Sequence, residues 1–255
     1  MQYKFAQERE NYAPYASGSV IYAAPGHTAF PVRLANEIFR RCVRFRNTQG
    51  ASGRCTLYDP CCGGGYHLTT LAYFNWAEIE RIVGSDIDAE AAALAARNLG
   101  LLQFDGLERR IVEITQMAGE FGKESHALAL KNALLLKHQL AAFLQDHPIA
   151  TRVFQADVSD QRDITAALGG VRPDVVISDI PYGRRSNWRE DSLALAAAKD
   201  PVYELLESLL AVLAPKAVVA IASAKTDKIL HERYQRLDRF QLGKRQIVIL
   251  RPIEA

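Results

Sequence analysis

Aspartates end several short apolar runs of this sequence, and segments with helical spacing separate the runs. These predicted strands cover residues 55–59, 81–86, 151–157 and 174–179. Short apolar runs that alternate with helical segments are typical of parallel strands covered by helices on both faces. Because parallel strands end at the same edge of a sheet, where open α/β sheets bind their ligands, we expect the four aspartates to lie together. The predicted fold class is therefore α/β, with a row of acids on the ligand-binding edge.

The remaining elements continue this alternation. Two more strands are predicted at 217–223 and 246–251, and helices at 31–46, 68–76, 89–99 and 201–213. Asp200 and Pro201 fit the N-cap and the first position of the last of these helices, and Asp88 fits the N-cap of the helix at 89–99.

An insertion interrupts the alternation between the helix at 89–99 and the strand at 151–157. About fifty residues lie there, where a βα unit needs only a short connection. Apolar residues recur at helical spacing in both halves of the interval, and Asp105 and Glu108 have the spacing of a capping box. We therefore predict a helical hairpin inserted at about 101–150 in a sheet domain that covers 55–255. An N-terminal helical extension at 1–54 precedes this domain.

The composition restricts the class of protein. The chain has 255 residues, of which 49% are hydrophobic, which suits one large α/β domain. No apolar run approaches the roughly 20 residues that cross a bilayer, and the N-terminus lacks the apolar segment of a secretory signal. The 4 cysteines lack the spacing of a zinc site or a disulfide framework. We expect a cytoplasmic protein with no membrane association, no metal and reduced thiols.

Basic residues gather in two regions, although the formal net charge is only +2. Six arginines lie between positions 33 and 54, and eight lysines or arginines lie between positions 225 and 251. Such runs either form solvated faces or bind an acidic partner.

A glycine-rich turn, D-P-C-C-G-G-G-Y at residues 59–66, follows the first predicted strand. Glycines let a ligand approach the backbone, and the helix that follows offers free N–H groups. Asp86 lies 23 residues after Gly63, at the end of the second strand, where an acid can bind ribose hydroxyls. Asp157, after the third strand, could accept a hydrogen bond from an adenine amino group. Ordinary tight turns and dinucleotide folds use such glycines too, and plain capping or loop roles for both aspartates remain the alternative.

The fourth predicted strand ends in S-D-I-P-Y-G, residues 178–183. The glycine turn is similar to motif I of class I S-adenosylmethionine-dependent methyltransferases, D-P-x-C-G-S-G, and S-D-I-P-Y-G resembles their motif IV, (D/N/S)-P-P-(Y/F/W). Segment 18–39 and the helical insertion extend the likeness over nearly the whole chain, which resembles the avilamycin-resistance type of 23S rRNA guanine methyltransferase. The resemblance implies a Rossmann-like seven-stranded sheet whose last strand is antiparallel to the others.

The resemblance also implies a site for S-adenosylmethionine at the sheet edge. The ligands would be Asp59 and the backbone around Cys61, Gly63 and Gly65 for the methionyl part, Asp86 for the ribose and Asp157 for the adenine. Two positions depart from the family pattern. Ile180 replaces the first proline of motif IV, which keeps a carbonyl acceptor but loosens the turn, and Gly64 stands where serine is usual, which removes one hydroxyl.

Motif IV would supply the catalytic residues. A base nitrogen with a delocalised lone pair is a poor nucleophile, so a site must orient it and accept its proton. Asp179 and the Ile180 carbonyl would accept hydrogen bonds from the base edge, Pro181 would fix the turn and Tyr182 would stack on a flipped base. An ionised carboxylate only accepts hydrogen bonds, which matches the N1–H and N2–H donors of guanine. Methylation of N1 and of N2 both stay open, and a turn in which Asp179 only caps backbone is the alternative.

The segment after motif IV, R-R-S-N-W-R at residues 184–189, combines charge with a stacking ring. Contacts with RNA phosphates and bases are expected from Arg184, Arg185, Trp188 and Arg189. A plain surface loop is the alternative. His27 and Phe30 either cover the cofactor or the target base, or simply pack.

The expected partner is 23S rRNA or the large ribosomal subunit, bound by a monomeric enzyme that serves antibiotic resistance or housekeeping modification. Three other functions stay open. The same fold could methylate DNA adenine or a protein glutamine, or the chain could be a non-catalytic RNA-binding module. An NAD-dependent oxidoreductase is disfavoured because the turn lacks a clean G-x-G-x-x-G.

Overall fold

The computed structural model describes residues 3–8, 10–25, 29–180 and 200–253. All four predicted RNA-contact residues and two catalytic residues of motif IV lie outside these ranges: Arg184, Arg185, Trp188, Arg189, Pro181 and Tyr182. His27 lies outside them as well.

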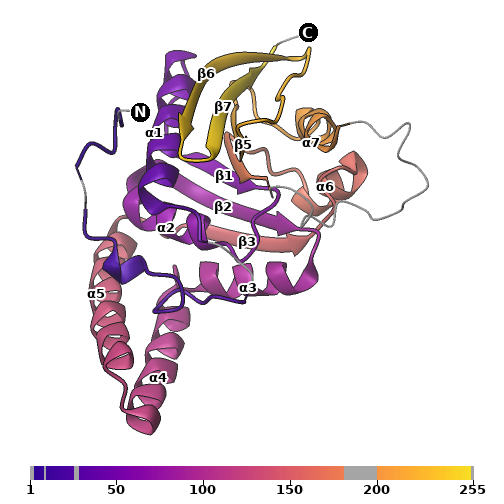
Figure 1. Ribbon diagram of the computed structural model, residues 1–255. Helices are drawn as coiled ribbons and strands as arrows, with labels where there is room; N and C mark the ends of the chain where they lie inside the picture. Colours follow the sequence, from indigo (N-terminus) through magenta and orange to yellow (C-terminus); the bar gives the residue numbers. More distant parts are fainter. Residues whose placement is uncertain (1–2, 9, 26–28, 181–199, 254–255) are drawn as a thin grey trace.

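Seven strands form one sheet in the order β3-β2-β1-β4-β5-β7-β6 (Figure 1). Their bounds are β1 Cys55–Asp59, β2 Ile79–Asp86, β3 Ala150–Gln155, β4 Val175–Asp179, β5 Val218–Ala224, β6 Tyr234–Leu242 and β7 Arg245–Pro252. Strands β1 to β5 are parallel to one another, whereas β7 is antiparallel to both β5 and β6. This confirms the predicted α/β class and the antiparallel last strand. Strand order reverses between β1 and β4, which is the switch point where such sheets bind ligands.

Successive side chains of the central strands pack into two hydrophobic cores on opposite faces of the sheet. Leu57 belongs to one core, and its neighbour Tyr58 belongs to the other. The first core lies under α1 Val32–Thr48, α2 Tyr66–Phe74 and α3 Ala89–Gly100; the second lies under α6 Gln161–Leu168 and α7 Pro201–Leu210. Because strand side chains alternate between faces, a strand that is apolar throughout must be covered on both sides. The near-continuous apolar runs of the sequence have this cause.

The predicted hairpin corresponds to α4 Phe104–Phe121 and α5 Glu124–Asp146, which extend away from the sheet (Figure 1). The predicted capping box is wrong: Gln103 is the N-cap, without a side-chain bond, and Asp105 lies in the first turn. A close contact between α3 and α4 lies in the first turn of α4. A Cβ on Gly106 would come 2.0 Å from the Gly100 carbonyl oxygen, so only glycine lets the turn between α3 and α4 close this tightly.

The described residues of the N-terminal extension pack against the sheet domain. A 3₁₀ helix at Ala13–Tyr15 contacts α5, and the Tyr15 ring lies 4.8 Å from the ring of Phe74. Glu37 of α1 is fully buried and accepts hydrogen bonds from the backbone N–H groups of residues 4, 5 and 6. In the part of the chain described here, no helix combines the length and apolar character needed to cross a membrane.

Candidate active site

The glycine turn after β1 is held by neighbouring elements. Gly63 and Gly65 have φ of +50° and +68°, in the left-handed region that side chains rarely adopt. A Cβ on Gly65 would lie 3.0 Å from Cα of Ala95 in α3, so α2 and α3 meet closely here. Asn98 of α3 donates a 2.7 Å hydrogen bond to the carbonyl of Gly64. The turn is therefore shaped by close packing as well as by its own glycines.

Gly64 stands where the family pattern has serine, and the structure gives a steric reason. A Cβ at this position would come 2.8 Å from Cδ2 of Leu94. A serine would therefore require the Leu94 side chain to move. Asn98 also joins the turn to the N-terminal segment, because its Oδ1 accepts the backbone N–H of Tyr22 at 2.8 Å.

Asp86 links the turn to the end of β2. Its Oδ2 accepts the N–H of Gly63 at 2.8 Å, and its Oδ1 accepts the N–H of Asp88 at 3.0 Å. Burial raises the pKa of Asp86, and the charge of Asp59 adds to this, while the two N–H donors lower it. The side chain is partly exposed at the carboxyl edge. Asp88 caps α3 through the N–H groups of Glu90 and Ala91, as predicted.

Asp59 lies beneath the turn, with a fully buried side chain. Its Oδ1 accepts the N–H of Cys61 at 3.0 Å, and its Oδ2 lies 3.1 Å from Nε2 of His67 in α2. The contact between Oδ2 of Asp59 and Nε2 of His67 has the distance of an ion pair but not the alignment of a hydrogen bond. Neither of these two atoms has a hydrogen-bond partner among the described residues. Burial lowers the pKa of His67, but Asp59 and, less strongly, Asp179 outweigh it, and the net pKa is raised.

The surroundings of the two cysteines of the turn disfavour the thiolate form that acts as a nucleophile. Burial raises the pKa of the Cys61 thiol, and the charge of Asp59 raises it further. Cys62 is buried and its pKa is shifted in the same direction for the same two reasons. Both shifts favour the neutral thiol over the thiolate. Within the described ranges, no group of histidine, cysteine and acidic residues could hold a metal ion.

Asp179 ends β4 beside this turn. It is partly exposed, whereas Ile180 is buried and donates its N–H to the carbonyl of Ala222 in β5 at 3.0 Å. Arg245, the first residue of β7, places Nε 3.7 Å from Oδ1 of Asp179. The ring of Phe30 lies 5.3 Å from the Arg245 guanidinium and 5.8 Å from the ring of His67.

Asp157 completes the row of acids. It follows β3, and its Oδ1 accepts hydrogen bonds from the N–H and the hydroxyl of Ser159 at 2.9 and 2.6 Å. Since β4, β1, β2 and β3 are parallel neighbours, the four aspartates at or just after their ends lie along one edge of the sheet. The sequence-based expectation of a shared edge is confirmed.

Several residues of this edge were missed by the sequence analysis: His67, Asn98 and Arg245. One signal was available for Arg245. Because an antiparallel last strand begins where the parallel strands end, its first residue lies at the ligand-binding edge. His67 had a weaker signal, a position in the first turn of the helix that follows the glycine turn.

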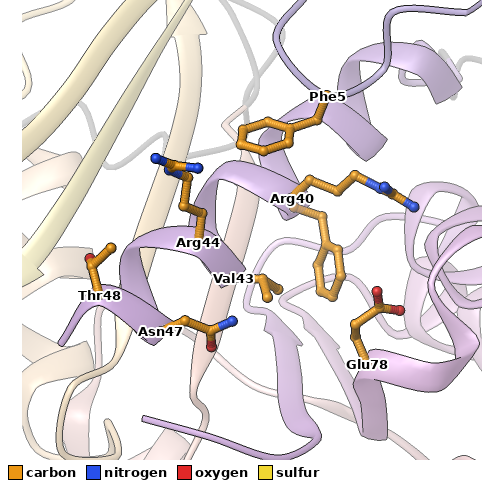
Figure 2. Close-up of a pocket in the computed structure, with 8 residues that line it drawn as sticks. Phe5, Arg40, Val43, Arg44, Asn47, Thr48 and Glu78 are labelled. Atoms are coloured by element: carbon orange, nitrogen blue, oxygen red, sulfur yellow. The ribbon is translucent and has the colours of Figure 1, made fainter. Parts of the chain in front are cut away.

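A pocket of about 520 Å³ lies elsewhere, on the outer face of α1 (Figure 2). Its lining includes Phe5, Arg40, Arg44 and Glu78, and none of the four aspartates. Glu78 lies just before β2 begins, so the pocket faces the opposite edge of the sheet. We therefore do not assign the active site to it.

The strand order, the antiparallel seventh strand and the acid-lined edge beside a glycine turn define a class I methyltransferase. The family model described as rRNA methyltransferase AviRa matches residues 1–245. The curated 23S rRNA (guanine(2535)-N(1))-methyltransferase of Streptomyces viridochromogenes is 39% identical over 249 residues, which cover 98% of this chain and 95% of that protein. The chain belongs to the AviRa family of rRNA methyltransferases, which confirms the activity predicted from the sequence.

Solved structures agree with this assignment. Two structures of the rRNA methyltransferase aviRa from Streptomyces viridochromogenes superpose with TM-scores of 0.84 and 0.85, at 37% and 36% identity. Each match covers 98% of this chain and 96% of the other. The likeness therefore includes the N-terminal segment and the α4–α5 hairpin.

Proposed function

We propose that this protein transfers a methyl group from S-adenosylmethionine to N1 of a guanine in 23S rRNA. The observation that carries the proposal is the position of Asp179, a partly exposed carboxylate at the switch-point edge of the sheet. The choice of 23S rRNA and of N1 is supported by the name of the relative from Streptomyces viridochromogenes.

The edge fits an adenosine-bearing cofactor. The backbone at Cys61, Gly63 and Gly65 would hold the methionyl part, with Asp59 supporting the turn from below. Asp86 accepts one N–H on each carboxylate oxygen, and because a carboxylate offers about four acceptor positions, it keeps capacity for two ribose hydroxyls. Asp157 would accept a hydrogen bond from the adenine amino group. When bound, S-adenosylmethionine supplies a methyl group on a sulfonium sulfur, which keeps the electron pair of the broken bond.

The chain's own residues would prepare the base. Asp179 accepts the N1–H proton of guanine, and the electron pair of the N–H bond stays on N1, which becomes the nucleophile. The Ile180 carbonyl accepts a hydrogen bond from the 2-amino group. Pro181 fixes the turn, and Tyr182 stacks on a base that has left its helix.

The RNA partner would be 23S rRNA, free or within the large subunit. Contacts with its phosphates and bases are assigned to Arg184, Arg185, Trp188 and Arg189. We further propose that the enzyme acts as a monomer, because one chain supplies every acid of the edge. We also propose that the chain consists of an extension at 1–54 and a methyltransferase domain at 55–255. The domain contains an insertion at about 101–150.

Mapping of modified positions tests the proposal. Cells that lack this gene are complemented with the wild type, Asp179→Ala or the control Asp105→Ala, an exposed acid on α4. A methyl group on N1 blocks the pairing edge of guanine, so reverse transcription of 23S rRNA should stop at one guanine with the wild type and the control only. The proposal would be overturned if 23S rRNA from cells with the wild-type gene showed no such stop. It would also be overturned if the stop persisted with Asp179→Ala.

A further inference from the structure

Arg245 lies at the catalytic edge because of strand direction. It opens β7 and pairs with Ala224 of β5, while Asp179 pairs with Ala222 on the other side of β5. Its Nε is 3.7 Å from Oδ1 of Asp179, and the two side chains are 26% and 23% exposed. At this distance the charges attract each other, but the separation exceeds that of an N–H···O hydrogen bond. The two groups stand side by side.

Packing restricts the position of the Arg245 side chain. Its guanidinium lies over the ring of Phe30 at 5.3 Å, and Phe30 is buried against His67. A guanidinium that contacts both an aromatic face and a carboxylate is held in place more firmly than a surface arginine. Its donors therefore lie at a defined place beside Asp179.

A structural role explains this pair poorly. Partly exposed ion pairs contribute little to stability. A neighbouring cation in general favours the ionised form of a carboxylate, whereas the proposed reaction requires Asp179 to accept a proton. An interaction of the guanidinium with the base itself would offset this opposition.

The pairing edge of guanine provides that role. On this edge, O6 is an acceptor and lies next to the N1–H and N2–H donors. A carboxylate beside a guanidinium presents acceptors beside donors, which matches this edge. Adenine has an amino group in place of O6, so the guanidinium would face a donor and remain unpaired, which is costly in a partly desolvated site.

We propose that Arg245 donates a hydrogen bond to O6 of the target guanine, both selecting the base and promoting its ionisation. The inference rests on the proposed function. As the N1–H proton moves to the Asp179 carboxylate, the electron pair stays on the base and spreads from N1 onto O6. The guanidinium stabilises the negative charge that develops there, as an oxyanion hole does.

Single-turnover methylation of a 23S rRNA fragment tests this role. Arg245→Met should lower the rate by about 100- to 1000-fold, the usual effect of removing one such donor. Binding of S-adenosylmethionine, measured by calorimetry, should be unchanged. The pH–rate profile should move to higher pH because the ionised base loses its stabilising partner. Arg245→Lys should recover part of the rate.

Arg251→Met is the matched control. This arginine lies in the same strand near its other end, where its Nε donates to Gln235, and its replacement should leave rate and pH profile unchanged. A substrate with 6-thioguanine at the target position adds a second readout. Its sulfur is a weaker acceptor and its N1–H is more acidic, so the defect of Arg245→Met should shrink.

Three outcomes would overturn the role of Arg245. These are a wild-type rate in Arg245→Met, a pH profile that does not move, or a rate loss matched by an equal loss of RNA binding. Each is distinguishable from failure of the proposed function, in which the wild type itself would not methylate the fragment. Thermal unfolding of every variant excludes a loss of fold as the cause.

Discussion

The backbone N–H of Gly63 donates a 2.8 Å hydrogen bond to Oδ2 of Asp86, which ties the glycine turn after β1 to the end of β2. The other oxygen of Asp86 accepts the N–H of Asp88, just before α3. One carboxylate thus fixes the loops on both sides of the proposed cofactor. Its importance for binding follows from this double role.

Asp86→Ala should weaken binding of S-adenosylmethionine. The substitution removes the acceptor proposed for ribose, a loss of about 1–3 kcal/mol of binding free energy, and it also leaves the Gly63 N–H without its partner. We therefore expect an affinity at least roughly 5-fold lower, since 1.4 kcal/mol corresponds to a factor of ten. Calorimetric titration measures it. The control is Asp88→Ala, which removes the cap of α3 and should lower stability by about 1 kcal/mol without a comparable loss of affinity. Equal losses in both variants would contradict the prediction.

Gly65→Ala should destabilise the fold more than Gly53→Ala. Both glycines have left-handed backbone, with φ of +68° and +77°, so alanine costs each about 1–2 kcal/mol. A Cβ at Gly65 also meets Ala95 at 3.0 Å, whereas nothing lies within 4 Å of one at Gly53. Urea unfolding of both variants isolates the effect of the contact. Equal free energies of unfolding in the two variants would show that α3 shifts to accommodate the added methyl group without loss of stability.

The contribution of His67 to stability should fall as pH rises. Its pKa is raised in the folded protein, mainly by Asp59 acting against burial. A histidine that binds its proton more tightly when folded stabilises the fold fully below its unfolded pKa of about 6.5. This stabilisation is lost as pH rises through the folded pKa. The difference in unfolding free energy between wild type and His67→Gln should therefore be larger at pH 6 than at pH 9.

The matched control for this measurement is His138→Gln, since His138 is exposed on α5. Its effect on stability should not depend on pH in the same way. A difference for His67→Gln that grows toward alkaline pH would mean that the buried imidazole is neutral beside Asp59.

Arg41→Met should destabilise the protein without affecting the active site. Arg41 is buried between Glu37, at 2.7 Å, and Asp238 of β6, also at 2.7 Å. Removing one partner of a buried pair leaves the other charge uncompensated and typically costs about 3–5 kcal/mol. Chemical denaturation measures the loss, with the exposed Arg40 replaced by Met as control. Weaker binding of S-adenosylmethionine in Arg41→Met at a temperature where it is folded would contradict the separation of the two regions.

Local patterns predicted most of the α-helices and strands of the described residues but missed one strand and one α-helix. In β6, at the edge of the sheet, one or two polar residues separate each aromatic or aliphatic residue from the next, so the strand has no apolar run of the kind that marked the others. The helix α6 spans only 8 residues and buries only Ile164 and Leu168, too few for a helical period to show. The caps at Asp88 and Asp200 were predicted because a cap depends on residues two or three positions away.

The sequence by itself determined the alternation of strands and helices, the common edge of Asp59, Asp86, Asp157 and Asp179, and the likeness to the family. Each follows from residues near one another in the chain, because strand periodicity, turn chemistry and motifs are local. Only the tertiary structure decided that His67 lies against Asp59 and that Arg245 stands beside Asp179. Those contacts depend on helix packing and on the register of β7 against β5. Both join distant residues, so local position can indicate the edge on which a residue lies but not the side chain that it meets there.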